Sequence, residues 1–125
     1  MLSNAPVAPA LPASDMARAR AFYEQALELP VVEEDPGGVT FGCGQGTAVF
    51  VYPSEFAGTN KATAAAFRVD DLDAVMARLR ERGVVFEDYD LPELKTVDGV
   101  ATFGDFKGAF FTDSEGNIIG LAQMG

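Results

Sequence analysis

The sequence predicts an α+β protein in which one βαβββ unit occurs twice in tandem. Two spacings predict this repeat. Asp15 and Asp71, 56 positions apart, each precede a segment whose apolar residues recur at helical intervals. Gly46-Thr47 and Gly116-Asn117, 70 positions apart, each open a closing apolar segment. Because one unit alone would bury little apolar surface, we expect both to share a core as one domain over residues 1–125. A ligand site is expected at the seam between the two units.

The first module is expected over residues 5–53. Ala5–Ala13 contains three prolines and therefore suits an irregular edge strand. After the N-cap Asp15, the apolar spacing predicts an amphipathic helix over Met16–Glu28, and Pro30 ends it. The remaining apolar segments of this module predict the strands Val31–Glu34, Val39–Gly44 and Thr47–Tyr52.

The second module is expected over residues 62–123. It begins with a strand over Thr63–Val69, and Asp71 then caps a helix over Leu72–Arg82 that ends at Gly83. The further strands are expected at Val84–Asp88, Ala109–Thr112 and Asn117–Gln123, and Val100–Phe106 is expected to be either a strand or an irregular lead-in. The second module is 14 residues longer between helix and closing strand, and most of this difference is assigned to an acidic loop over Tyr89–Gly99.

Charge and composition exclude several functions. Nine basic residues against 19 acidic residues give a net charge of -10, which argues against nucleic acid as a partner and indicates a soluble acidic surface or, more weakly, a neutral or cationic ligand. No segment reaches the roughly 20 apolar residues that span a bilayer, so no membrane partner is expected. The single cysteine, Cys43, is interpreted as a structural thiol, and a cytoplasmic location is expected. The chain has no histidine, which removes the commonest general base and a common metal ligand.

Three segments resemble the vicinal oxygen chelate superfamily, which contains glyoxalases, bleomycin resistance proteins and extradiol dioxygenases. The residues that carry the resemblance are Asp15 to Tyr23 (DMARARAFY), Phe67 to Asp73 (FRVDDLD) and Phe110 to Ile119 (FFTDSEGNII). The third is similar to the family's closing turn, with Ser114 where proline is usual. The resemblance covers nearly the whole chain and implies two βαβββ modules that form a curved mixed sheet around a cleft.

Metal-dependent members of this family hold the ion with His or Glu at four strand positions facing the cleft. Counting along the motifs assigns those positions to Ala8, Phe50, Ala64 and Gly120. None of these side chains can donate an electron pair to a metal. The resemblance therefore implies an apolar cleft, and we expect neither a metal nor another cofactor.

The candidate ligand-binding residues combine these four positions with others expected near the cleft. The set is Ala8, Phe41, Phe50, Tyr52, Ala64, Phe103, Asp105 and Gly120. Aromatic residues in strands more often belong to an ordinary core, and a solvated surface position is favoured for Asp105. Asp113 and Asn117 are interpreted as turn residues that bond to the local backbone, and no catalytic residue is assigned.

These expectations favour a homodimer that binds a small organic molecule without a metal and sequesters a drug or metabolite. The alternative is a metal-free or degenerate lyase or isomerase of the same superfamily, which would use Asp105 or a tyrosine as its acid–base group. A third interpretation is a cleft filled by its own side chains, in a protein that acts only as an interaction module. An open cavity would favour binding, and a buried carboxylate with a raised pKa would favour catalysis.

Overall fold

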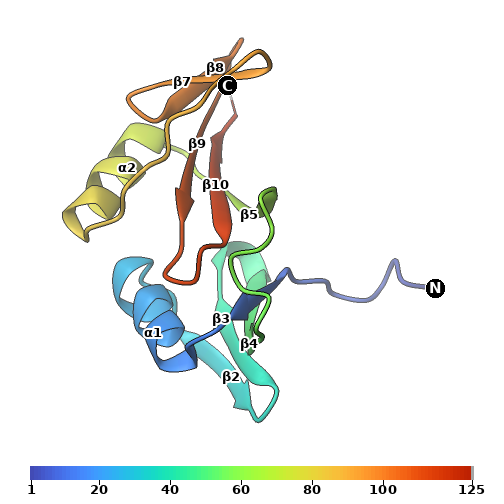
Figure 1. Ribbon diagram of the computed structural model, residues 1–125. Helices are drawn as coiled ribbons and strands as arrows, with labels where there is room; N and C mark the ends of the chain where they lie inside the picture. The colour runs from blue at the N-terminus through green and yellow to red at the C-terminus, as the bar shows by residue number, and fades with distance from the viewer. Residues whose placement is uncertain (125) are drawn as a thin grey trace.

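The computed structural model describes residues 1–124, which form two mixed β-sheets with helices α1 (Met16–Ala21) and α2 (Leu72–Glu81) on the same side of them (Figure 1). The first sheet has the strand order β1-β4-β3-β2, and the second has the order β5-β10-β9-β8-β7-β6. The strands are β1 (Ala10–Ala13), β2 (Val31–Asp35), β3 (Gly38–Gly42), β4 (Ala48–Pro53), β5 (Thr63–Arg68), β6 (Asp90–Leu91), β7 (Leu94–Val97), β8 (Val100–Phe103), β9 (Phe106–Thr112) and β10 (Ile118–Gln123). The α+β class expected from the sequence is confirmed.

The two sheets repeat one pattern of strand pairing. In each, the first strand runs parallel to the closing strand, with Ala10 beside Phe50 and Ala66 beside Gly120. The closing strand pairs antiparallel with the preceding strand, as β4 does with β3 and β10 with β9. That preceding strand pairs antiparallel with the next one back, as β3 does with β2 and β9 with β8. The second sheet then adds the hairpin β6–β7 at its outer edge. This hairpin accounts for much of the extra length of the second half.

Both helices begin as their capping residues predict. The carboxylate of Asp15 accepts a hydrogen bond from the backbone N–H of Arg18 at 3.1 Å, and that of Asp71 accepts one from Ala74 at 3.1 Å. The single helix expected over residues 16–28 is instead divided. After α1, a π-helical segment η1 (Phe22–Ala26) follows, and the chain turns at Glu28 with φ 59°. The wider π-helical turn ends the regular α-helix earlier than the apolar spacing indicates.

One apolar core lies between the helices and the sheets. Tyr23 stacks on Phe41 with ring centroids 5.3 Å apart, and Phe22 lies 6.5 Å from Phe111 of the second sheet. These aromatic contacts join buried residues of both halves into a single hydrophobic cluster. The shared core follows from the small amount of apolar surface that each half could bury alone.

Two expectations about residues 84–99 are wrong. The segment 84–88 is not a strand, because only Phe86 forms a single antiparallel bridge with Phe111. β8 already pairs with β9 over Phe106 to Ala109, which leaves little of that edge for another strand. The segment expected to be a loop, Tyr89–Gly99, instead contains β6 and β7. Alternation between buried and exposed residues in 84–88 reflects packing under α2 rather than strand pairing.

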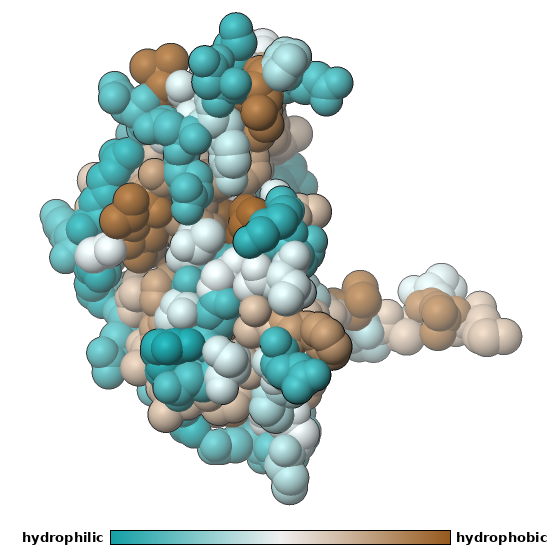
Figure 2. All heavy atoms as spheres, in the orientation of Figure 1, coloured by the Kyte–Doolittle hydropathy of each residue, from teal (hydrophilic) through white to brown (hydrophobic). Residues whose placement is uncertain are grey.

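The N-terminal segment extends away from the sheets (Figure 1). Residues 1–8 are all exposed, and the segment stands clear of the rest of the surface in Figure 2, with apolar Met1, Leu2 and Val7 in solvent. β1 therefore begins at Ala10, later than the expected Ala5. Within residues 1–124, neither helix has the length and apolar character that crossing a bilayer requires.

Candidate ligand-binding groove

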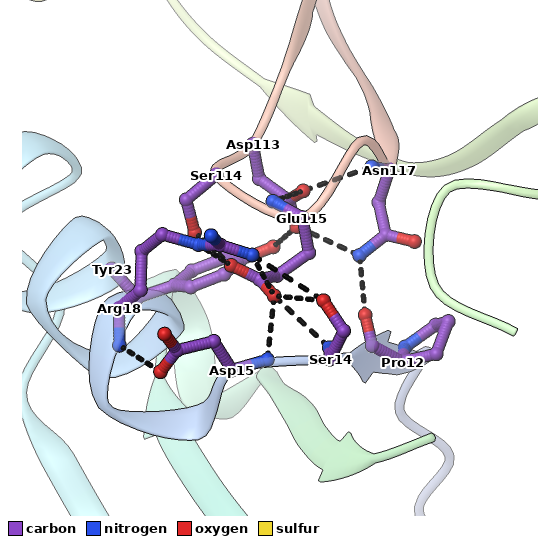
Figure 3. A network of polar contacts seen from close by, with 9 residues as sticks. All are labelled: Pro12, Ser14, Asp15, Arg18, Tyr23, Asp113, Ser114, Glu115 and Asn117. Atoms are coloured by element: carbon purple, nitrogen blue, oxygen red, sulfur yellow. Dashed lines mark hydrogen bonds and ion pairs between the residues drawn. The ribbon is translucent and has the colours of Figure 1, made fainter. Parts of the chain in front are cut away.

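The two sheets are joined where the turn between β9 and β10 meets the connection between β1 and α1 (Figure 3). At this closed junction, the side chain of Glu115 is fully buried. Its Oε1 accepts hydrogen bonds from the backbone N–H groups of Ser14 at 3.0 Å and Asp15 at 2.9 Å. Its Oε2 lies 2.8 Å from Nε of Arg18. One carboxylate from the second sheet thus holds the start of α1.

The partners of Glu115 change its acidity. Burial alone would raise its pKa, but hydrogen bonds from Arg18, from the Asp15 backbone and from the Ser114 hydroxyl, with the charge of Arg18, lower the pKa to about 2. The same contact raises the pKa of the Arg18 guanidinium. The pair is therefore ionised at neutral pH, and its negative charge is compensated within the junction.

A second set of polar contacts lies beside Glu115. The hydroxyl of Tyr23 donates to Oδ2 of buried Asp113 at 2.5 Å, and burial with this neighbouring carboxylate raises the pKa of Tyr23 strongly. Nδ2 of Asn117 donates to the backbone oxygen of Pro12 at 2.8 Å. Asp113 also accepts the backbone N–H groups of Glu115 and Asn117, as expected for a turn residue. The turn residues thus fix the local backbone and also connect the two sheets.

A groove of about 850 Å³ lies where the first sheet faces β5. Its walls come from the β3–β4 connection and from β5 with the start of the connection to α2. The lining consists of residues 43–45, 47–49 and 65–70 together with Val7, Pro9 and Met124. The groove is open to solvent and has both apolar and polar walls, which suits an organic ligand with a few polar groups.

Cys43 is the only cysteine of the chain, and it lines this groove. The residue is half-buried, and its thiol lies 3.9 Å from the backbone oxygen of Phe41. Burial raises the pKa of the thiol, so the protonated form dominates at neutral pH. This supports the interpretation of Cys43 as a structural thiol rather than an activated nucleophile.

None of the eight candidate residues lines the groove, although Ala8, Phe50 and Ala64 each adjoin a lining residue. Phe50 and Tyr52 alternate with buried Val49 and Val51, so their side chains lie on the sheet face away from α1. Their rings are nearly parallel, with an interplanar angle of 8° and centroids 6.1 Å apart. They form an aromatic surface next to the groove rather than its wall.

The other candidates are dispersed. Phe41 is 0% exposed and packs in the core, so its side chain lies on the helix-facing side of the sheet. Gly120 lies in β10, where a Cβ would meet Thr63, Ala66 and Phe110. Phe103 is 48% exposed near the outer edge of the second sheet, and Asp105 is exposed in the turn that follows it.

The residues at the four positions that the resemblance assigns to metal ligands do not fit a metal ion. Phe50 lies beside Ala10, and Gly120 beside Ala66, so each closing-strand position is flanked by methyl groups. Among residues 1–124, no three His, Cys, Asp or Glu side chains converge in a geometry suited to a metal ion. The side chains at these positions therefore provide no ligands on which a metal-dependent reaction could be based.

Comparison with known proteins places these features in context. The model of the glyoxalase/bleomycin resistance protein/dioxygenase superfamily matches residues 6–121. TnmS3, an antibiotic binding protein from Streptomyces sp. CB03234, is 26% identical, with a TM-score of 0.70 over 100% of this chain and 99% of that chain. A glyoxalase/bleomycin resistance protein from the same organism is 27% identical, with a TM-score of 0.66 over 91% and 96% of the two chains.

A lactoylglutathione lyase from Agrobacterium tumefaciens shares the fold, with 21% identity and a TM-score of 0.67 over 98% of this chain and 96% of that chain. No curated protein sequence matches this chain significantly.

Proposed function

Because the chain belongs to the glyoxalase/bleomycin resistance protein/dioxygenase superfamily, we propose that it binds and sequesters a small organic molecule, a drug or a metabolite, without a metal ion. The observation that carries this proposal is the open groove at the seam between the sheets. Its volume of about 850 Å³ lies within the range typical of sites for drug-sized ligands. The similarity to TnmS3, an antibiotic binding protein, supports the same class of ligand.

Metal independence is supported by the side chains around the groove. Ala8, Phe50 and Ala64 have no side-chain lone pair and Gly120 has no side chain at the four positions that the resemblance assigns to metal ligands. Ala8, Phe50 and Ala64 adjoin residues of the groove wall rather than forming it. Phe50 and Tyr52 would extend the ligand surface beyond the groove onto the open face of β4.

A homodimer is part of this proposal. β1 and β5 each pair with one strand only, so both sheets have a free edge within the described chain. The aromatic surface of β4 is half-buried and the apolar N-terminal segment is exposed in a single chain. A second copy that covers these surfaces would complete the wall of the groove. A reducing cytoplasm would suit the one free thiol.

The alternative, a metal-free or degenerate lyase or isomerase, has less support. Asp105 is exposed and does not line the groove. The buried Tyr23 donates to Asp113 and has a raised pKa, which makes it a poor acid–base group at neutral pH. Both groups therefore have structural or solvated roles rather than positions beside a bound molecule.

Native mass spectrometry of the purified protein, with elemental analysis, tests the proposed function. We expect a dimer that carries an organic adduct and no stoichiometric divalent metal. Release of the adduct followed by titration of the same compound should restore one adduct per chain. Stoichiometric metal would refute metal independence, and a protein that binds no compound from an extract of small molecules would refute the binding function.

A further inference from the structure

The groove occupies the position that corresponds, in the repeat, to the closed junction. Residues 41–47, at the end of β3 and in the β3–β4 connection, match residues 111–117, at the end of β9 and in the β9–β10 turn, at the 70-residue spacing. Gly46 and Gly116 both have positive φ, at 78° and 87°, whereas Gln45 also has a positive φ of 58° and its counterpart Glu115 does not. Residues 65–70, on the opposite wall, match residues 9–14 at the 56-residue spacing. One junction is filled with hydrogen bonds, and its counterpart is open.

The residues that fill the closed junction are replaced in its counterpart. Glu115, which bonds the start of α1, is matched by Gln45. Arg18, which neutralises Glu115, is matched by Ala74, whose side chain has no donor. Ser14, whose backbone and hydroxyl both donate to Glu115, is matched by Asp70.

The buried pair beside Glu115 is replaced as well. Asp113 corresponds to Cys43, and Tyr23 corresponds to Leu79, so neither the carboxylate nor the phenol is present. Within residues 1–124, no hydrogen bond or ion pair joins the β3–β4 connection to residues 70–74. Loss of these contacts removes the attraction that would hold the two walls together.

We propose that Gln45, Asp70 and Ala74 keep this groove open as a ligand site, because they remove the hydrogen-bonded charge pair that closes the equivalent junction at Glu115. The assignment of a ligand rests on the proposed function, whereas the open state rests on the replacement of the junction residues, of which these three are the ones that the test changes. All three are exposed, so their side chains can be changed without altering the core. If position 45 carried Glu, position 74 Arg and position 70 Ser, the carboxylate at position 45 could pair with the guanidinium at position 74. The carboxylate of Asp70, which would repel it, would be absent.

The test is the triple variant Gln45→Glu, Asp70→Ser, Ala74→Arg, which transfers the closed junction's residues to the groove. Iodoacetamide is the probe, because Cys43 is the only thiol and lies in the groove wall. We expect alkylation of Cys43 to slow by about tenfold or more relative to wild type, as a charged hydrogen-bonded contact of ordinary strength would produce. High salt should restore part of the wild-type rate.

The matched control carries Gln45→Glu and Asp70→Ser with Ala77→Arg. Ala77 is exposed on the same helix, so this variant has the same composition and net charge but places the guanidinium elsewhere. It should react at nearly the wild-type rate. Circular dichroism and thermal unfolding establish that both variants are folded.

Equal alkylation rates for the folded triple variant, its control and wild type would overturn the inference, whatever the native mass spectra show. Slow alkylation confined to the triple variant supports it, even if wild type carries no adduct. If wild type does carry an adduct, the triple variant should lose it and the control should keep it. An adduct retained by a triple variant with a shielded Cys43 would place the ligand elsewhere and overturn the assignment of the site.

Discussion

Replacing Glu115 by Gln tests how the closed junction is stabilised. The substitution removes one charge and keeps nearly the same volume in a fully buried side chain. A carboxyl whose pKa falls from 4.5 to about 2 is bound about 3 kcal/mol more strongly when ionised than when protonated. An amide oxygen still accepts some of the same hydrogen bonds. We therefore expect the free energy of unfolding at pH 7 to fall by about 2–3 kcal/mol.

The pH dependence gives the sharper test of the same substitution. Because the pKa of Glu115 in the folded protein lies below its ordinary value of 4.5, its stabilisation is present above that pH and is lost as the pH falls towards 2. The difference between wild type and Glu115→Gln should thus be largest at pH 7 and shrink towards zero near pH 2. Other carboxyls titrate in both proteins and cancel in the difference.

Urea unfolding, followed by circular dichroism from pH 7 down to pH 2.5, measures this difference. Glu93→Gln is the control, because Glu93 is exposed and forms no ion pair within residues 1–124. It should change the unfolding free energy by less than about 0.5 kcal/mol at every pH. If Glu115→Gln lowered the free energy of unfolding by the same amount at every pH, the charge-based account would be refuted. If it lowered that free energy no more than the control does, the junction would not stabilise the fold.

Three further substitutions test separate parts of the fold. Tyr23→Phe removes the hydroxyl that donates to buried Asp113 at 2.5 Å, and should lower the unfolding free energy by about 1–3 kcal/mol in urea; a smaller effect would contradict the bond. Gly38→Ala would place a Cβ 2.4 Å from a backbone oxygen, so thermal unfolding should show a loss of more than about 2 kcal/mol, and an unchanged midpoint would contradict this close approach. Glu28→Ala removes the surface ion pairs with Arg78 and Arg82, and should leave the midpoint of thermal unfolding nearly unchanged; a clear fall in the midpoint would show that these exposed pairs stabilise the fold.

Local rules predicted the parts of the fold that depend on neighbouring residues. Asp15 and Asp71 were identified as helix caps because a carboxylate bonds N–H groups within the next turn, and both do so. The repeat spacing then predicted the closing strands. The α+β class could thus be obtained from capping, apolar periodicity and the repeat together.

The roles of Glu115 and Phe41 could not be predicted in the same way. Glu115 was seen only within a turn, because its partners Ser14 and Arg18 lie about 100 positions earlier in the chain. Alternation along a strand tells which residues share a face, but it does not tell which face meets the helix, and Phe41 lies on the helix side. The residues that line the groove could not be predicted for a related reason. The groove depends on contacts that the chain does not make, which are visible only when Gln45 and Ala74 are compared with Glu115 and Arg18.

The parallel pairing of first and closing strands also constrains the order in which a growing chain can fold. β1 has no strand partner until β4 has been made, and β5 has none until β10 has been made. During synthesis the first sheet can therefore assemble once Pro53 has emerged, while its contact with Glu115 must wait for almost the entire chain. In that interval the start of α1 lacks its buried carboxylate, and the nascent first half exposes at its closed junction the same kind of opening that the finished protein keeps at its groove.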